Sequence, residues 1–118
     1  MDYRVTFYED AQGNAPVRDY IDNLGFKDRA KILKFIDFLR ERGGVLDEPY
    51  SKHIRGKIRE LRVDFQNRRH RVLYFTFVNK NIILLHAFLK KSQKTPELEI
   101  IKATKIYDAV QKNRKAYE

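Results

Sequence analysis

The 118-residue sequence predicts one α+β domain, in which a strand and two helices precede three strands and a final helix. Apolar residues recur with helical spacing in residues 27–42. Alternation and β-forming side chains mark residues 57–65, 69–78 and 82–89, and helix-start residues precede a helix at 97–114. Because 42% of the residues are hydrophobic, the chain has enough apolar material for one core.

The first half of the chain contains the predicted first strand and two helices. Residues 3–8 alternate and are rich in β-forming side chains, which is typical of a strand. Pro16 favours a helix start, and Gly25 ends the short helix predicted for residues 16–24. The helix predicted for residues 27–42 places four apolar side chains on one face. They are Ile32, Phe35, Ile36 and Leu39.

The second half is predicted to be strands separated by turns. Gly43 and Gly44 supply the left-handed backbone that ends a helix, and residues 45–56 are predicted to be a loop. Polar turns are expected at residues 66–68 and 79–81, between the three predicted strands.

Thr95, Pro96 and Glu97 have the pattern of a helix start, with Thr95 as the N-cap and an acidic first turn. The helix that follows, to about residue 114, is expected to turn one apolar stripe toward the core. The stripe consists of Ile100, Ala103, Tyr107 and Val110.

Charge is divided unevenly along the chain. Residues 1–50 carry 8 Lys/Arg and 10 Asp/Glu, a net of −2, whereas residues 51–118 carry 17 Lys/Arg and 6 Asp/Glu, a net of +11. The two parts sum to the net charge of +9. A surplus this uneven indicates a surface that binds a polyanion, most simply nucleic acid.

Several classes of site are excluded or disfavoured. The chain has no cysteine, so it has no disulfide, thiolate zinc site or cysteine nucleophile. It also lacks a P-loop, a dinucleotide-type glycine pattern, a GxSxG elbow and an HExxH motif. His53, His70 and His86 lack the helical spacing of a metal site. We therefore expect no cofactor and no metal. Since no signal peptide and no membrane-spanning run is visible, we expect a soluble cytoplasmic protein.

Basic residues gather between residues 52 and 71. They are Lys52, His53, Arg55, Lys57, Arg59, Arg62, Arg68, Arg69, His70 and Arg71. One interpretation is a solvated strand-and-turn surface. The other is a phosphate-binding site, because alternation places Glu60 and Arg62 on one face and Arg71 begins the antiparallel partner strand. Arginines grouped in this way repel one another unless an anion lies between them.

A second basic group, Lys90, Lys91 and Lys94, follows the last predicted strand and precedes a helix. Both a phosphate-binding role and a solubilising role fit this position. His86 and His53 are candidates for proton transfer near neutral pH. The alternative for His86 is a buried structural histidine, and the alternative for His53 is a solvated loop histidine.

Three motifs carry a family resemblance. They are Glu60-Leu61-Arg62, Arg71-Val72-Leu73-Tyr74 and the sequence LHAFLKKSQKTP at residues 85–96. Together they resemble the RelE/HigB superfamily of toxins, and most closely its phage-derived, HigB-like branch. The resemblance implies a RelE-like α+β domain in which antiparallel strands pack against helices. It also implies a type II toxin that cleaves mRNA, often in the ribosomal A site, and is inhibited by a cognate antitoxin.

The resemblance implies roles for individual residues. Arg71 matches an arginine that contacts the scissile phosphate, and Lys91, with the lysine before it, matches a second phosphate-binding cation. Glu60 stands where RelE-type toxins have a lysine for proton transfer. Their catalytic tyrosine after the last strand has no counterpart here. His53 is the nearest candidate for the histidine that some HigB-type toxins use.

The predicted site therefore has two groups of residues. The catalytic candidates are Arg71, Lys91, His53 and Glu60. The phosphate-binding candidates are Arg62, Lys90, Lys94, Lys57, Arg59 and Arg69. The expected partners are mRNA, the ribosome and a helix-turn-helix antitoxin, with no membrane.

The expected reaction uses the ribose 2′-OH of RNA as nucleophile and leaves a 2′,3′-cyclic phosphate and a 5′-hydroxyl. Cations stabilise the charge that grows on the phosphate oxygens. Two alternatives stay open. One is a non-catalytic toxin of the RelE/ParE fold that acts on a topoisomerase. The other is a basic RNA-binding module without turnover, whose binding depends steeply on salt.

Overall fold

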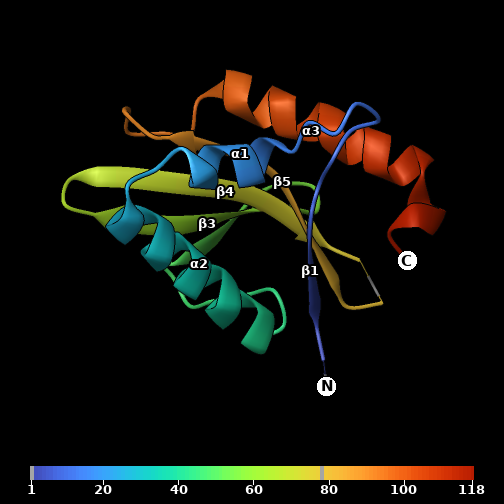
Figure 1. Ribbon diagram of the computed structural model, residues 1–118, viewed down its shortest axis with the longest axis horizontal. Coiled ribbons are helices and arrows are strands. Elements are labelled where there is room, and N and C mark those ends of the chain that lie inside the picture. Colours follow the sequence, from blue (N-terminus) through green and yellow to red (C-terminus); the bar gives the residue numbers. More distant parts are fainter. Residues whose placement is uncertain (1, 78) are drawn as a thin grey trace.

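In the computed structural model, which describes residues 2–77 and 79–118, five strands form one sheet with helices on both faces (Figure 1). The elements are β1 (Arg4–Phe7), α1 (Pro16–Asp22), α2 (Phe26–Glu41), β2 (Ser51–Arg55), β3 (Ile58–Phe65), β4 (Arg68–Thr76), β5 (Asn81–Leu89), α3 (Glu97–Lys112) and the 3-10 helix η1 (Arg114–Ala116). The α+β class is confirmed, but the order contains one strand more than the sequence predicts.

The additional strand is β2, which lies inside the segment predicted to be a loop, so that prediction is wrong for residues 51–55. Its sequence, SKHIR, has a single large apolar residue, Ile54, and therefore shows no apolar alternation. It forms because it pairs antiparallel with the edge of β3, where Lys52 lies opposite Glu60. Short, charged strands are typical of sheet edges.

The strand order is β1-β5-β4-β3-β2, with β1 parallel to β5 and all other neighbours antiparallel. β3 and β4 are joined at Gln66 and Asn67, whose φ angles of 48° and 66° fit a two-residue hairpin turn. This turn sets the register in which Arg62 lies opposite Arg71. β4 ends at Thr76, and the predicted strand end at Val78 lies outside the described residues.

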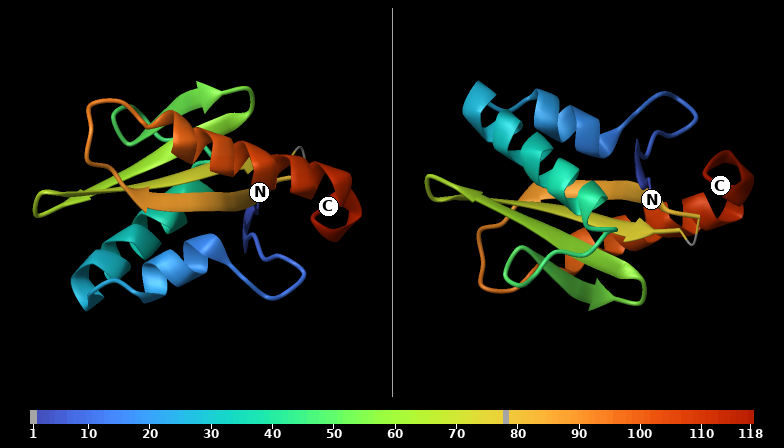
Figure 2. Two further views of the ribbon diagram at one scale, coloured as in Figure 1. Left: turned by 90° about the horizontal axis from the view of Figure 1, so that it is seen from above. Right: turned by 90° about the horizontal axis from the view of Figure 1, so that it is seen from below.

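The helices cover opposite faces of the sheet (Figure 2). On one face α1 and α2 pack over a core that includes Ile32 and Leu39, and Phe35 is half-buried at its margin. On the other face α3 inserts Ala103 and Val110 against β4 and β5. The apolar faces predicted for both long helices are therefore confirmed. Each face of the sheet has its own core, as a sheet covered on both sides requires.

The two predicted helix ends differ in outcome. Gly43 and Gly44 have φ angles of 72° and 92°, so the left-handed end of α2 is confirmed. Thr95 is not an N-cap. Pro96 holds that position without a side-chain hydrogen bond, and the Thr95 hydroxyl donates instead to the carboxylate of Glu60.

Candidate functional site

The β3–β4 hairpin gathers charged side chains on the α3 side of the sheet. Successive residues of a strand point to opposite faces, so the alternating positions of β3 carry Glu60, Arg62 and Asp64 on this side. The register places Arg62 opposite Arg71 and Asp64 opposite Arg69. The predicted proximity of the two arginine-bearing strands is therefore confirmed.

Six residues form what we call the hairpin cluster. They are Glu60, Arg62, Asp64, Arg69, Arg71 and Lys90. The cluster contains four cations and two carboxylates, so part of its positive charge is left without an internal partner. This remaining charge favours an anionic ligand.

Glu60 is the centre of the cluster and is fully buried. Arg62 donates from Nε to Oε1 at 3.0 Å, and the Thr95 hydroxyl donates to Oε2. Arg71 Nε lies 4.0 Å from Oε1. A buried carboxylate is tolerated only where such partners replace water, so these contacts fix Glu60 and its partners relative to one another.

The Arg71 guanidinium forms hydrogen bonds through Nη1 but none through Nε. Its Nη1 donates to Asp64 Oδ1 at 2.7 Å and to the His70 carbonyl at 2.9 Å. Its Nε is buried and has no hydrogen-bond partner among the described residues. Since buried donors are nearly always paired, this unpaired N–H is unusual and is free to donate to an acceptor on a ligand.

Lys90 begins the segment that covers the cluster. The residue is buried, and its backbone N–H donates to the Arg69 carbonyl at 2.8 Å. Burial lowers the pKa of the Lys90 amine, and Arg71 and Arg62 lower the pKa further, whereas Glu60 acts in the opposite direction. The lowered pKa makes the Lys90 ammonium a stronger acid than that of a solvated lysine.

The segment between Lys90 and Thr95 is anchored to the cluster at both ends, by the buried Lys90 and by the Thr95–Glu60 hydrogen bond. Between these anchors, Lys91 and Lys94 are exposed. Neither forms an ion pair within residues 2–77 and 79–118. The two lysines therefore lie, without an ion-pair partner in the described residues, on a segment whose two ends contact the hairpin cluster.

Four predicted residues are not brought into the cluster. Arg59 lies opposite the buried Tyr74 and donates to the Ser51 hydroxyl at 3.2 Å, on the α2 side of the sheet. His53 is paired with Arg59, and its ring contacts the Gly56 carbonyl at 2.8 Å. Lys57 is exposed at the β2–β3 turn.

His86, the fourth, donates from Nε2 to Glu99 Oε1 at 2.7 Å and so joins β5 to α3. Within the described residues, no hydrogen bond or ion pair joins the His86 side chain to the hairpin cluster. Of the proton-transfer candidates that the sequence offers, only Glu60 belongs to the hairpin cluster.

A buried polar network on the α2 side was not predicted from the sequence. Arg68 binds Asp28 through two hydrogen bonds, of 2.6 and 2.7 Å. Since a carboxylate only accepts, His70 Nε2 donates to Asp28 at 2.7 Å and His70 Nδ1 accepts from the Tyr20 hydroxyl, also at 2.7 Å. The Arg68 guanidinium holds the pKa of Asp28 well below its usual range. Burial, with the Asp28 charge, raises the pKa of Tyr20 to about 12.

This network fixes β4 to the helices and so holds the backbone that carries Arg71. The spacing of Arg68 and His70 places both on one face of β4, which the sequence could have indicated. Their contact with Asp28, 40 residues away, is not visible in local sequence.

In residues 2–77 and 79–118, no three His, Asp or Glu side chains come together as a set that could hold a metal ion. None of the helices in this part of the chain has the length and apolar character needed to cross a bilayer.

The chain matches a protein-family model described as "Phage derived protein Gp49-like (DUF891)". The match covers residues 19–108, about three quarters of the chain. The matched span contains β2 to β5 and the whole hairpin cluster. No curated protein matches the chain.

Proposed function

The chain belongs to the phage-derived Gp49-like family, a family of RelE-like toxins, and from this premise we propose that it is a type II toxin of the HigB-like branch that cleaves mRNA. Family membership implies an antitoxin as partner. We propose that this antitoxin is of the helix-turn-helix type. We also propose that the toxin acts in the cytoplasm, on mRNA bound to the ribosome.

The observation that carries the proposal is the arrangement of the hairpin cluster. Arg62 is oriented by the buried carboxylate of Glu60 and Arg71 by the exposed carboxylate of Asp64, and Arg71 Nε is left without a hydrogen-bond partner in the described residues. Lys91 and Lys94 are exposed on the adjoining segment. Fixed cations around one point stabilise the charge that develops on a phosphate during displacement, at little reorganisation cost.

In the proposed reaction, the ribose 2′-OH attacks the adjacent phosphorus and forms the new O–P bond. Glu60 accepts the 2′-OH proton. The bond from phosphorus to the 5′-oxygen breaks, and that oxygen takes a proton from the Lys90 ammonium. The products are a 2′,3′-cyclic phosphate and a 5′-hydroxyl. A lysine with a lowered pKa is a better acid for this step than a solvated one.

The proposal is tested with the purified protein and a defined mRNA, with and without ribosomes. Wild type is expected to cut the RNA, and Lys91→Ala is expected to lower kcat by about 10²-fold, the typical cost of removing one stabilising group. Arg71→Gln is expected to lower it at least as much. Lys105→Ala, an exposed lysine on α3, is the matched control.

Absence of cleavage by the wild type under all these conditions would overturn the proposal. Growth arrest without any RNA cutting would then favour the topoisomerase-directed alternative. RNA binding without turnover would favour the binding module.

A further inference from the structure

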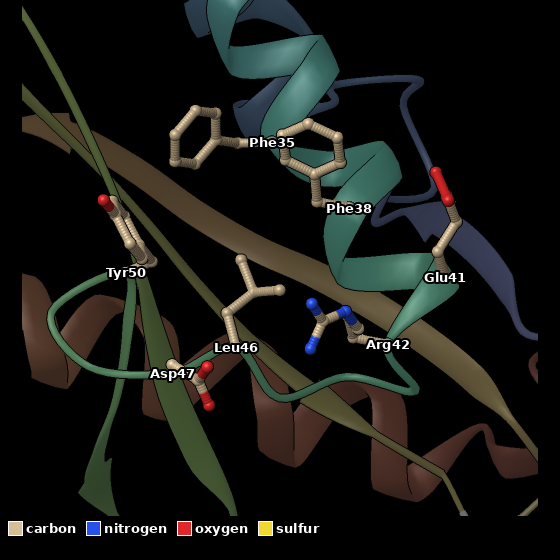
Figure 3. Close-up of a pocket in the computed structure, with 7 residues that line it drawn as sticks. All are labelled: Phe35, Phe38, Glu41, Arg42, Leu46, Asp47 and Tyr50. Carbon is tan, nitrogen blue, oxygen red and sulfur yellow. The ribbon is translucent and has the colours of Figure 1, made fainter.

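An open aromatic groove lies between the C-terminal half of α2 and the segment that leads to β2. Its volume is about 390 Å³. Its lining consists of Phe35, Phe38, Glu41, Arg42, Leu46, Asp47 and Tyr50. Figure 3 shows Phe35 and Phe38 on α2, Tyr50 on the loop side, and Leu46 between Tyr50 and Arg42.

The aromatic rings of the groove are close to one another yet open to solvent. The ring centroids of Phe35 and Phe38 are 5.7 Å apart, and those of Phe35 and Tyr50 are 5.8 Å apart. Phe38 is 40% exposed and Tyr50 is 50% exposed. Aromatic rings left accessible in a groove are suited to a flat, π-bonded ligand, because stacking uses their faces.

The groove continues toward the hairpin cluster. A smaller hollow of about 150 Å³ shares Phe35 and Tyr50 with it. The other residues that line this hollow are Lys31, Pro49, Arg62, Asp64 and Arg71. A ligand that fills both spaces therefore meets aromatic rings at one end and phosphate-binding arginines at the other.

The polar groups at the aromatic end match a nucleobase edge. Arg42 and Asp47 line the groove, both are exposed, and neither forms an ion pair within the described residues. In Figure 3 the Arg42 guanidinium is directed toward Leu46. A guanidinium donates to O6 or N7 of guanine, and a carboxylate accepts from base N–H groups. Guanine presents both kinds of edge group.

We propose that this groove binds a base of the RNA substrate next to the nucleotide whose phosphate lies at the hairpin cluster, with a preference for guanine. The proposal rests on the proposed function, because that function supplies the RNA. A protein segment is the rival occupant of an apolar groove. The shared lining with Arg62 and Arg71 favours RNA, since cations at one end and base-matching groups at the other fit a nucleotide.

The test uses fluorescein-labelled RNA hexamers with 2′-O-methyl riboses, which cannot attack their own phosphates. One hexamer carries a single guanine among uridines, one carries adenine at that position, and one is abasic there. Binding is measured by fluorescence anisotropy. Removal of one stacked base is expected to weaken binding to the wild type by between about 5-fold and about 150-fold.

Variants of groove residues test whether the base-dependent binding arises in the groove. Phe38→Ser and Tyr50→Ser are expected to bind the guanine and abasic hexamers alike, whereas Tyr50→Phe keeps the difference because its ring is intact. Asp47→Asn is expected to reduce the preference for guanine over adenine. Phe26→Ser is the control, since Phe26 is 75% exposed on α2 and does not line the groove.

Equal binding of guanine and abasic hexamers by the wild type overturns the groove proposal. The proposal is also overturned if Phe38→Ser and Tyr50→Ser keep the base preference but lose antitoxin binding. That result would show that the groove binds protein. Cleavage of unmodified mRNA, measured in parallel, separates the two proposals. Cutting without base-dependent binding refutes the groove alone, and base-dependent binding without cutting refutes the nuclease alone.

Discussion

Replacement of Asp28 by Asn tests how the buried network supports the fold. Asp28 accepts two hydrogen bonds from Arg68 and one from His70, all between 2.6 and 2.7 Å. A hydrogen bond to a charged group contributes about 1.5–3 kcal/mol, but Arg68 is nearly half exposed, so solvent screens its share. We expect Asp28→Asn to lower the free energy of unfolding by about 3 kcal/mol, because breaking a buried pair leaves its partners unsatisfied.

The size of this loss depends on pH in a direction that follows from the lowered pKa of Asp28. A depressed pKa in the folded state means that the stabilisation is present above the unfolded pKa, about 3.9, and is lost as pH falls toward the folded value. Since the unfolded carboxyl is mostly protonated at pH 3, the difference between wild type and Asp28→Asn is expected to be about 1 kcal/mol smaller there than at pH 7.

Urea unfolding followed by circular dichroism at pH 7 and pH 3 measures both effects. Asp22→Asn is the control, because Asp22 is exposed on α1 and its side chain has no hydrogen bond or ion pair with the described residues. A loss below about 0.5 kcal/mol at pH 7, the range of ordinary surface substitutions, would refute the reasoning, as would a loss that does not change with pH.

Three further predictions concern single residues. Gly44→Ala is expected to lower the free energy of unfolding by about 2 kcal/mol, because φ is 92° and a Cβ would lie 2.6 Å from Thr76 Oγ1. Gly25→Ala, where nothing lies near the added Cβ, is the control and should lose less than half of that in the same thermal melt. Lys91→Ala should reduce the slope of the logarithm of the RNA-binding constant against log salt by about 0.7 for single-stranded RNA. An unchanged slope would show that Lys91 does not contact an RNA phosphate. Lys90→Arg keeps the charge but not the lowered pKa, so kcat should fall about 10²-fold while RNA affinity stays within about 3-fold; an unchanged kcat would exclude Lys90 as the acid.

Local patterns were sufficient to predict most of the elements. The 3.6-residue spacing of Ile32, Phe35 and Leu39 identified α2, and the paired glycines identified its end, because both signals arise within one element. β2 was missed, since it is polar and short and depends on the edge of β3 for its pairing. The parallel pairing of β1 with β5 is likewise set by tertiary packing over more than 70 residues.

The candidate site was predictable to the extent that alternation along a strand decides which face a side chain occupies. This placed Glu60, Arg62 and Arg71 together, and the same rule separates Arg59 from them. The role of Thr95 was missed because local sequence favours an N-cap, whereas the buried Glu60 carboxylate offers its hydroxyl a stronger partner. The aromatic groove combines α2 with residues 46–50 and is visible only in three dimensions.

The most direct test of the central claim is cleavage of an RNA in which a single 2′-OH, at the nucleotide 5′ to the bond that the wild type cuts, is replaced by hydrogen. Mass spectrometry then identifies the end groups of the fragments. The account predicts a 2′,3′-cyclic phosphate and a 5′-hydroxyl from the unmodified RNA and no cut at the altered position. Continued cutting there, or a 5′-phosphate on the downstream fragment, would contradict attack by the sugar hydroxyl.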